Sequence, residues 1–141
     1  FYTGQQRKNN KILKEQDVST KQDKKEVLNS LHYIKDSGYK ILEIVQSGNI
    51  DDLGIMFKKH WEMKKKLSSG VTNSKIDSIY NIALKNGAIG GKISGAGGGG
   101  FFTFYCNKDH SKLRRAMFDK GLKELDYSFD FDGSKIIANH R

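Results

Sequence analysis

The sequence predicts an α+β fold with a small antiparallel sheet, and three patterns support this. Long segments in the first two thirds of the chain carry apolar residues at helical spacing. An almost continuous aromatic run from Phe101 to Cys106 is typical of a strand buried on both faces. From Leu125 to Phe131, apolar and polar residues alternate, which indicates a half-buried strand. A proline-free chain of 141 residues, 36 % of them apolar, fits one compact domain and excludes a disordered or collagen-like polymer.

Helices are expected over five segments. In the longest, apolar residues recur at steps near 3.6 from Val27 to Val45, which predicts an amphipathic helix. Asn73 and its neighbours offer N-cap oxygens to a later helix, and Asp109 is expected to cap the last one. The expected helices cover residues 9–16, 21–46, 50–67, 74–85 and 110–120.

Four strands complete the expected fold, near Phe1 and over 89–94, 101–106 and 125–131. A two-residue turn at Asp132-Gly133 would join the last strand to Lys135-Ile136-Ile137. The order strand, helices, strand, strand, helix, strand is ferredoxin-like, with helices on one face of the sheet and the extra helices in the first crossover. No internal repeat or linker divides the chain.

Charge and cysteine usage narrow the expected setting. Lysine and arginine number 25 against 16 acidic residues, and the net charge of +9 favours an anionic partner such as nucleic acid, an acidic surface or a phosphorylated small molecule. No window approaches the roughly 18 apolar residues that a membrane helix needs, so no membrane partner is expected. The single cysteine, Cys106, excludes an intrachain disulfide and favours a cytoplasmic location.

Glycines concentrate in one place. Seven of the 15 glycines lie between Gly90 and Gly100, where they cost chain entropy and leave the backbone bare. Successive N–H groups in such a loop can converge on the oxygens of a phosphate. The plain alternative is a flexible connection between two strands. On the phosphate hypothesis, valine at Gly97 is expected to reduce turnover with little change in folding stability.

Three known phosphate motifs do not fit this loop. A P-loop needs Ser or Thr directly after Gly-Lys, but Gly91-Lys92 is followed by Ile93. A dinucleotide fingerprint must open a helix, whereas the residues after Gly100 are typical of a strand. The other signature elements of protein kinases are missing.

A fourth motif does fit. The segment Lys92-Ile93-Ser94-Gly95-Ala96-Gly97-Gly98-Gly99-Gly100-Phe101 resembles the third motif of the GHMP small-molecule kinases. Further similarities point to the sugar-phosphate branch of that family, which includes heptose 7-phosphate kinases: Tyr2-Thr3-Gly4 with Arg7, His60-Trp61 with Lys64, and Thr72-Asn73. The resemblance covers nearly the whole chain but matches only the C-terminal half of the family.

The resemblance implies that residues 1–141 form the C-terminal domain of an ATP-dependent kinase acting on D-glycero-D-manno-heptose 7-phosphate. The implied phosphate-loop residues are Lys92, Ser94, Gly95, Ala96, Gly97, Gly98 and Gly99. The implied substrate-binding residues are Thr3, Gly4, Arg7, His60, Trp61 and Lys64. The loop that wraps the nucleotide and the acidic residue that engages Mg²⁺ or the acceptor hydroxyl belong to the N-terminal half, the expected partner. We therefore expect no catalytic residue or metal ligand in this fragment, and no turnover by the fragment alone.

Several alternatives stay open at this point. Lys92 either meets a phosphate or points into water, Arg7 fits an ordinary surface arginine, and Trp61 on an apolar stripe fits a core residue. A non-catalytic small-molecule-binding domain would have the same sequence features. An RNA-binding module with an RRM-like sheet is the other alternative, but its signature spacing is absent, so no nucleic acid partner is expected.

Overall fold

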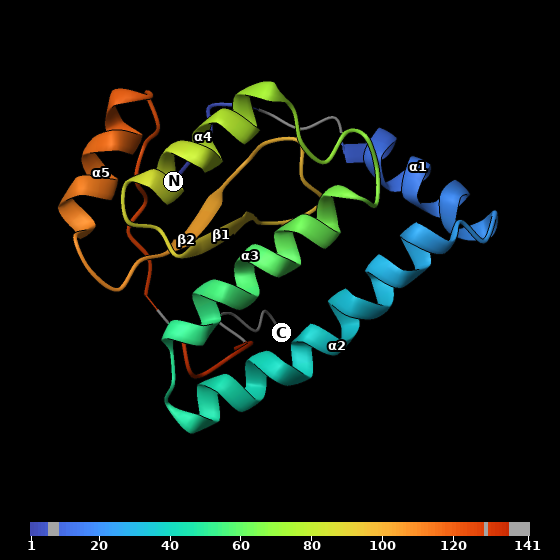
Figure 1. Cartoon of the computed structure of the whole chain (residues 1–141), viewed down its shortest axis with the longest axis horizontal. Coiled ribbons are helices and arrows are strands. Elements are labelled where there is room, and N and C mark those ends of the chain that lie inside the picture. The colour runs from blue at the N-terminus through green and yellow to red at the C-terminus, as the bar shows by residue number, and fades with distance from the viewer. Residues whose placement is uncertain (6–8, 129, 136–141) are drawn as a thin grey trace, which may run out of the picture.

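The computed structural model describes residues 1–5, 9–128 and 130–135 and has the expected α+β class (Figure 1). The strands are β1 (Gly90–Ile93) and β2 (Phe102–Tyr105). The helices are α1 (Asn9–Lys21), α2 (Lys25–Ser47), α3 (Asp51–Lys65), α4 (Ser74–Lys85) and α5 (His110–Asp119). All five expected helices are present, although α1 extends five residues beyond the expected end at 16. None of the helices in this part of the chain is long and apolar enough to cross a membrane.

The strands have the expected ferredoxin-like order, but fewer residues than expected take part in the sheet. Strands β1 and β2 pair antiparallel, with Ile93 opposite Phe102. Beyond β2, Tyr2 forms isolated antiparallel bridges to Phe101 on one side and Lys123 on the other. The spatial order is therefore β1, β2, the segment at Tyr2 and the segment at Lys123. This is the arrangement of a ferredoxin-like sheet, with the two outer strand positions on that side reduced to single bridges.

The strand predicted over 125–131 is wrong for the residues described there. Tyr127 is 77 % exposed and Phe131 92 % exposed, so neither ring is buried as a half-buried strand would require. Tyr2 and Lys123 pair antiparallel, so the chain beyond Lys123 runs past Phe1, and none of the described residues bridges to 125–128 or 130–131. Phe129 and the expected second hairpin arm at Ile136-Ile137 lie outside the described residues.

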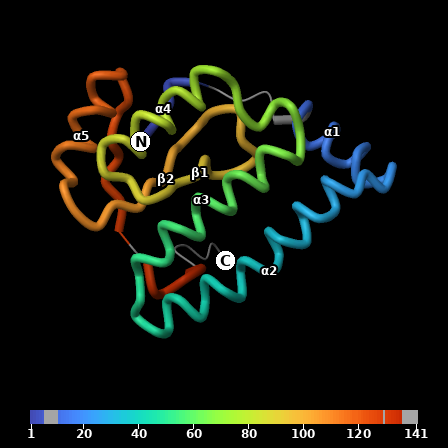
Figure 2. Tube along the Cα trace, viewed as in Figure 1, coloured from blue at the N-terminus to red at the C-terminus, as the bar shows by residue number. Residues whose placement is uncertain are grey.

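Helices lie on both sides of the strands in Figures 1 and 2. Helices α4 and α5 cover the sheet face that carries Phe102 and Phe104, whose rings stack 4.9 Å apart. Helix α3 runs along β1 and also meets residues of the opposite face, and α2 packs on α3. Helices were expected on one face of the sheet, and α3 also contacts the other face. The core comprises Ile12, Trp61, Val71, Ile76, Ile79, Tyr80, Ala83, Ala88, Ile93, Phe102, Leu113, Met117 and Leu122.

Helix α2 forms as predicted, but its buried face differs from the apolar stripe. Its buried residues are Val27, Ser30 and Ser37. The small serines lie on the buried side of the helix, and Ser37 also contacts α3 through His60. Leu42 and Val45, which belong to the predicted stripe, are 55 % and 52 % exposed. Helical periodicity therefore identified the element but not which residues it buries.

The two predicted N-caps have different outcomes. The side chain of Asn73 accepts a hydrogen bond from the Ile76 N–H at 3.0 Å, which confirms its capping role at α4. Asp109 precedes α5 in a left-handed conformation and makes no side-chain cap hydrogen bond, so that prediction is wrong.

Close packing of α3 on β1 predicts that Gly90 tolerates no side chain. A Cβ at Gly90 would lie 1.9 Å from the Gly54 carbonyl oxygen, so we expect Gly90→Ala to destabilise the fold by at least about 2 kcal/mol. The matched control is Gly38→Ala, in open space within α2, which we expect to stabilise by about 0.5–1 kcal/mol. Thermal denaturation measures both, and equal melting temperatures for the two variants would contradict the packing described here.

Candidate functional site

The glycine loop, residues 94–100, connects β1 to β2 and curves between α4 and the end of α3 (Figure 1). Its backbone has positive φ at each of its five glycines, from +72° at Gly98 to +141° at Gly99. L-residues with side chains rarely adopt these angles, so the loop's shape requires glycine. This conformational requirement explains part of the glycine density independently of any ligand.

Close packing explains another part. A Cβ at Gly97 would lie 2.8 Å from the Val71 carbonyl oxygen, and one at Gly99 would lie 2.8 Å from the Gln5 carbonyl oxygen. The loop therefore lies directly against two other backbone segments. This corrects the expectation that valine at Gly97 leaves folding stability nearly unchanged, because any side chain there collides with backbone at a φ of +103°.

The end of the loop is attached to the chain start. The Gly100 carbonyl accepts hydrogen bonds from the Thr3 N–H at 2.8 Å and from Thr3 Oγ1 at 2.9 Å. The Gly100 N–H donates to the Gln5 carbonyl at 3.1 Å. Thr3 is buried, so its hydroxyl holds the loop rather than facing the solvent. Gly4, the other predicted sugar contact here, is exposed and forms the turn between Thr3 and Gln5.

The loop's N–H groups divide into two sets. Those of Ser94 and Gly98 donate to the carbonyls of Phe101 and Val71, at 2.9 and 2.8 Å. In contrast, no described residue accepts a hydrogen bond from the N–H groups of three successive residues, Gly95, Ala96 and Gly97. Gly95 is exposed, Ala96 half-buried and Gly97 buried, so the loop opens to solvent at Gly95 and Ala96. Consecutive unpartnered N–H groups form an anion-binding concavity when the backbone alternates between right-handed and left-handed conformations.

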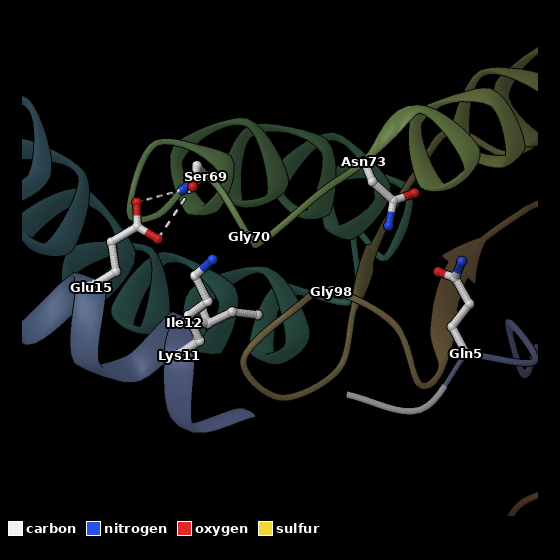
Figure 3. A pocket seen from close by; sticks show the side chains of 8 residues that line it. All are labelled: Gln5, Lys11, Ile12, Glu15, Ser69, Gly70, Asn73 and Gly98. Carbon is white, nitrogen blue, oxygen red and sulfur yellow. Dashed lines mark hydrogen bonds between the residues drawn. The ribbon is translucent and has the colours of Figure 1, made fainter. Parts of the chain in front are cut away.

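A pocket of about 530 Å³ adjoins the loop at Gly98 (Figure 3). Lys11, Ile12 and Glu15 of α1 lie on one side of Gly98, and Gln5 and Asn73 lie on the other. The remaining lining residues are Ser69 and Gly70, in the turn before α4. The Gln5 Oε1 atom is buried and has no hydrogen-bond partner among the described residues. The pocket therefore offers polar groups next to the phosphate-loop candidate.

Glu15 belongs to the pocket wall and is held in place. Its carboxylate accepts hydrogen bonds from Ser68 Oγ at 2.7 Å and from the Ser69 N–H at 3.2 Å. These hydrogen bonds lower the pKa of Glu15, and the bond from Ser68 has the largest effect. The carboxylate thereby fixes α1 against the turn that the loop packs on. Gln5, Lys11, Glu15 and Ser69 could not be predicted as pocket residues, because their spacing in the chain resembles no motif.

Lys64 and Lys92 lie at the start of the loop. Lys64 Nζ donates hydrogen bonds to the carbonyls of Ile93, at 3.0 Å, and Gly95. Lys92 neither points into open water nor extends along the loop: its Nζ lies 5.2 Å from the centre of the Phe57 ring on α3. Burial lowers the pKa of Lys92. Two cationic side chains are therefore half-buried where β1 enters the loop.

His60 lies one helical turn before Lys64, and its contacts define its tautomer. The Ser37 hydroxyl donates its only hydrogen to the Ile34 carbonyl at 2.7 Å, so the contact between Ser37 Oγ and His60 Nδ1, at 3.3 Å, requires a hydrogen on Nδ1. Burial, with the charges of Lys92 and Lys64, lowers the pKa of His60 to about 4. The imidazole is therefore neutral at pH 7, with Nε2 as a hydrogen-bond acceptor.

Trp61 is not brought into the pocket. Trp61 has no exposed surface and packs against Tyr80 and Phe102, so a direct sugar contact by Trp61 is wrong. Its position on the apolar stripe of α3 faces the core, as the alternative interpretation held. Arg7 lies outside the described residues. The aromatic rings that suggested an RRM-like surface are partly internal, since Phe102 and Phe104 face the helices.

The described part of the chain has no cluster of side chains suited to a metal ion. No group of three or more histidine, cysteine, aspartate or glutamate side chains there could hold a metal ion. The amides of the loop match the oxygens of an anion rather than a cation. What the site offers is hydrogen-bond donation and positive charge.

Comparison with known proteins identifies relatives of this chain. The family described as GHMP kinases C terminal matches residues 41–124. A D-glycero-alpha-D-manno-heptose 7-phosphate kinase from Campylobacter jejuni subsp. jejuni serotype O:2 is 34 % identical over 110 residues, covering 77 % of this chain and 32 % of the relative. An L-fucokinase/L-fucose-1-P guanylyltransferase from Bacteroides fragilis is 30 % identical over 114 residues, covering 81 % of this chain and 12 % of the relative. The chain thus spans about a third of the first relative's length and less of the second's.

The environment of His60 predicts an abnormal titration. By NMR, we expect its imidazole to stay neutral down to about pH 5, because the pKa is lowered from 6.5 to about 4. The unfolded chain takes up this proton at the higher pH, so acidification from pH 6.5 toward 4 destabilises the fold. Lys92→Met should raise the pKa of His60, whereas Lys59→Met, at an exposed lysine of the same helix, should not. A titration midpoint near 6.5 in the unmodified protein would contradict the structure.

Proposed function

The chain belongs to the GHMP kinases, through their C-terminal domain, and from that premise we propose that it serves an ATP-dependent sugar-phosphate kinase. In this proposal residues 1–141 form the C-terminal domain, and the partner is the N-terminal half of the same kinase. The acceptor is a phosphorylated sugar, D-glycero-D-manno-heptose 7-phosphate by similarity to the Campylobacter relative. The single cysteine supports a cytoplasmic location for the reaction.

The observation that carries the proposal is the set of unpartnered amides at Gly95, Ala96 and Gly97. Phosphoryl transfer needs little covalent chemistry from the protein, because the transferred group passes through a loose transition state with negative charge on its outer oxygens. Fixed amide dipoles stabilise that charge without reorganising during the reaction. The three N–H groups would donate hydrogen bonds to phosphate oxygens of ATP bound in a cleft between the two halves.

Packing makes the amides suitable for this work. The loop lies against Val71 and Gln5 on one side, and the exposed Gly95 and half-buried Ala96 lie on the other. A loop supported in this way holds its donors in position before the nucleotide binds, which lowers the ordering cost on binding. The half-buried Lys64 and Lys92 add positive potential at the loop entry. Together these features favour a polyphosphate over a neutral ligand.

The residues present fit the phosphates of ATP but not the metal that accompanies them. Mg²⁺ prefers carboxylate and phosphate oxygens. Among the described residues near the loop, the Glu15 carboxylate is already engaged by Ser68 and Ser69. When bound, Mg²⁺ would neutralise charge on the phosphates, and the protein ligands for it would come from the N-terminal half. The catalytic acid or base would also come from that half.

For the sugar phosphate, we propose the pocket beside Gly98 together with the predicted contacts that remain accessible. Lys11 and Asn73 can donate hydrogen bonds there, and the unpartnered Gln5 Oε1 can accept one from a hydroxyl. His60, with Nε2 free to accept, Gly4 and Arg7 remain proposed substrate contacts. Thr3 and Lys64 would act through the loop that they hold.

Removal of one amide tests the proposal in the complete protein. Ala96→Pro deletes the N–H at the centre of the set, and we expect kcat/KM for ATP with heptose 7-phosphate as acceptor to fall by roughly 100-fold. Ala96→Ser retains the N–H and should keep most of the activity. Phosphate transfer from radiolabelled ATP measures both, with melting temperatures to verify folding. Failure of the unmodified protein to phosphorylate the sugar, or full activity of a folded Ala96→Pro variant, would contradict the proposal.

A further inference from the structure

Lys64 lies on helix α3, but its ammonium group is bound to the backbone at the entry of the glycine loop. It donates hydrogen bonds to the carbonyl oxygens of Ile93 and Gly95, two residues apart in the chain. The side chain is half-buried between its helix and the loop. A lysine in this position is therefore a support for the loop, whereas the sequence had suggested a sugar contact.

Peptide geometry gives this support a directional consequence. The described peptide bonds are all trans, so each carbonyl points opposite to the N–H of the following residue. Lys64 draws the Ile93 carbonyl toward α3, and the Ser94 N–H accordingly points away from α3, where it donates to the Phe101 carbonyl at 2.9 Å. The same geometry at Gly95 directs the N–H of Ala96 away from α3. That N–H is the central member of the unpartnered set.

Other contacts between described residues hold other parts of the loop. Thr3 and Gln5 hold Gly100, and Val71 holds Gly98 through its carbonyl. Gly95 has a φ of +80° and no Cβ, so the peptide group between Gly95 and Ala96 can rotate easily unless something holds its oxygen. Among the described residues, Lys64 is the side chain that holds it.

We propose that Lys64 is a positioning residue that aims the Ala96 N–H at a bound phosphate by holding the carbonyl oxygens of Ile93 and Gly95. The proposal rests on the proposed function for the identity of the anion. It gives Lys64 a role that requires no contact between Lys64 and the anion. The hydrogen bonds require a donor that reaches both carbonyls. Arginine at this position retains the charge and the donors, while methionine retains the aliphatic stem and loses both.

The test compares Lys64→Met and Lys64→Arg in the complete protein, with Lys59→Met as control for the loss of one positive charge on the same helix. The first measurement is amide hydrogen exchange at Ser94. The second is the shift of the Ala96 amide resonance on titration with inorganic tripolyphosphate. We expect Lys64→Met to speed Ser94 exchange at least tenfold and to reduce the Ala96 shift at saturation at least threefold. Lys64→Arg and Lys59→Met should resemble the unmodified protein in both measurements.

The two measurements separate this proposal from the proposed function. Unchanged Ser94 exchange in Lys64→Met, or an unchanged Ala96 shift at saturation, overturns the positioning role. If Lys64→Met only lowered global stability, its folded molecules would keep the full Ala96 shift at saturation. That result also counts against the positioning role. If the unmodified protein shows no Ala96 shift, the proposed function fails. In that case, tenfold faster Ser94 exchange in Lys64→Met would still show that Lys64 holds the loop, and unchanged exchange would show that it does not.

Discussion

The glycine loop can take its shape only because it carries no side chain where it meets the rest of the backbone. Carbonyl oxygens of Val71 and Gln5 lie only 2.8 Å from where a Cβ on Gly97 or Gly99 would be. This close approach fixes the loop on one side and leaves Gly95 and Ala96 open on the other. Packing and binding are therefore two consequences of the same bare backbone. The two interpretations of the glycine run, a connection between strands and an anion cradle, do not exclude each other.

Supports for the loop come from parts of the chain that are distant in sequence. Thr3 holds the exit, Lys64 holds the entry, and Glu15 fixes the helix and turn that the middle packs against. A site built in this way depends on the fold as a whole, because each support belongs to a different element. Thr3 and Lys64, which resemble substrate contacts of the family, are hydrogen-bonded to the loop in this structure. Their contribution is to hold N–H groups still, which is what electrostatic stabilisation of a phosphoryl group requires.

Local chemistry could be predicted from the sequence, and long-range geometry could not. The glycine loop, the helices and the Asn73 cap follow from residue type and spacing, and the ferredoxin-like order follows from the sequence of elements. The strand over 125–131 failed because alternation cannot show whether a strand has a partner: beyond the antiparallel bridge of Lys123 to Tyr2, the described residues of this segment pair with no described strand. Periodicity likewise could not decide that α2 buries Ser37 rather than Leu42. The target of the Lys64 ammonium, at a carbonyl 31 residues away, has no local signal at all.

A crystal structure of the complete protein with a non-hydrolysable ATP analogue tests the central claim most directly. We expect phosphate oxygens of the analogue to lie within about 3.2 Å of the backbone nitrogens of Gly95, Ala96 and Gly97. The loop itself should keep its contacts with Val71 and Gln5, since it is already held in the binding conformation. Phosphates bound elsewhere, with those three nitrogens hydrogen-bonded to protein carbonyls instead, would contradict it.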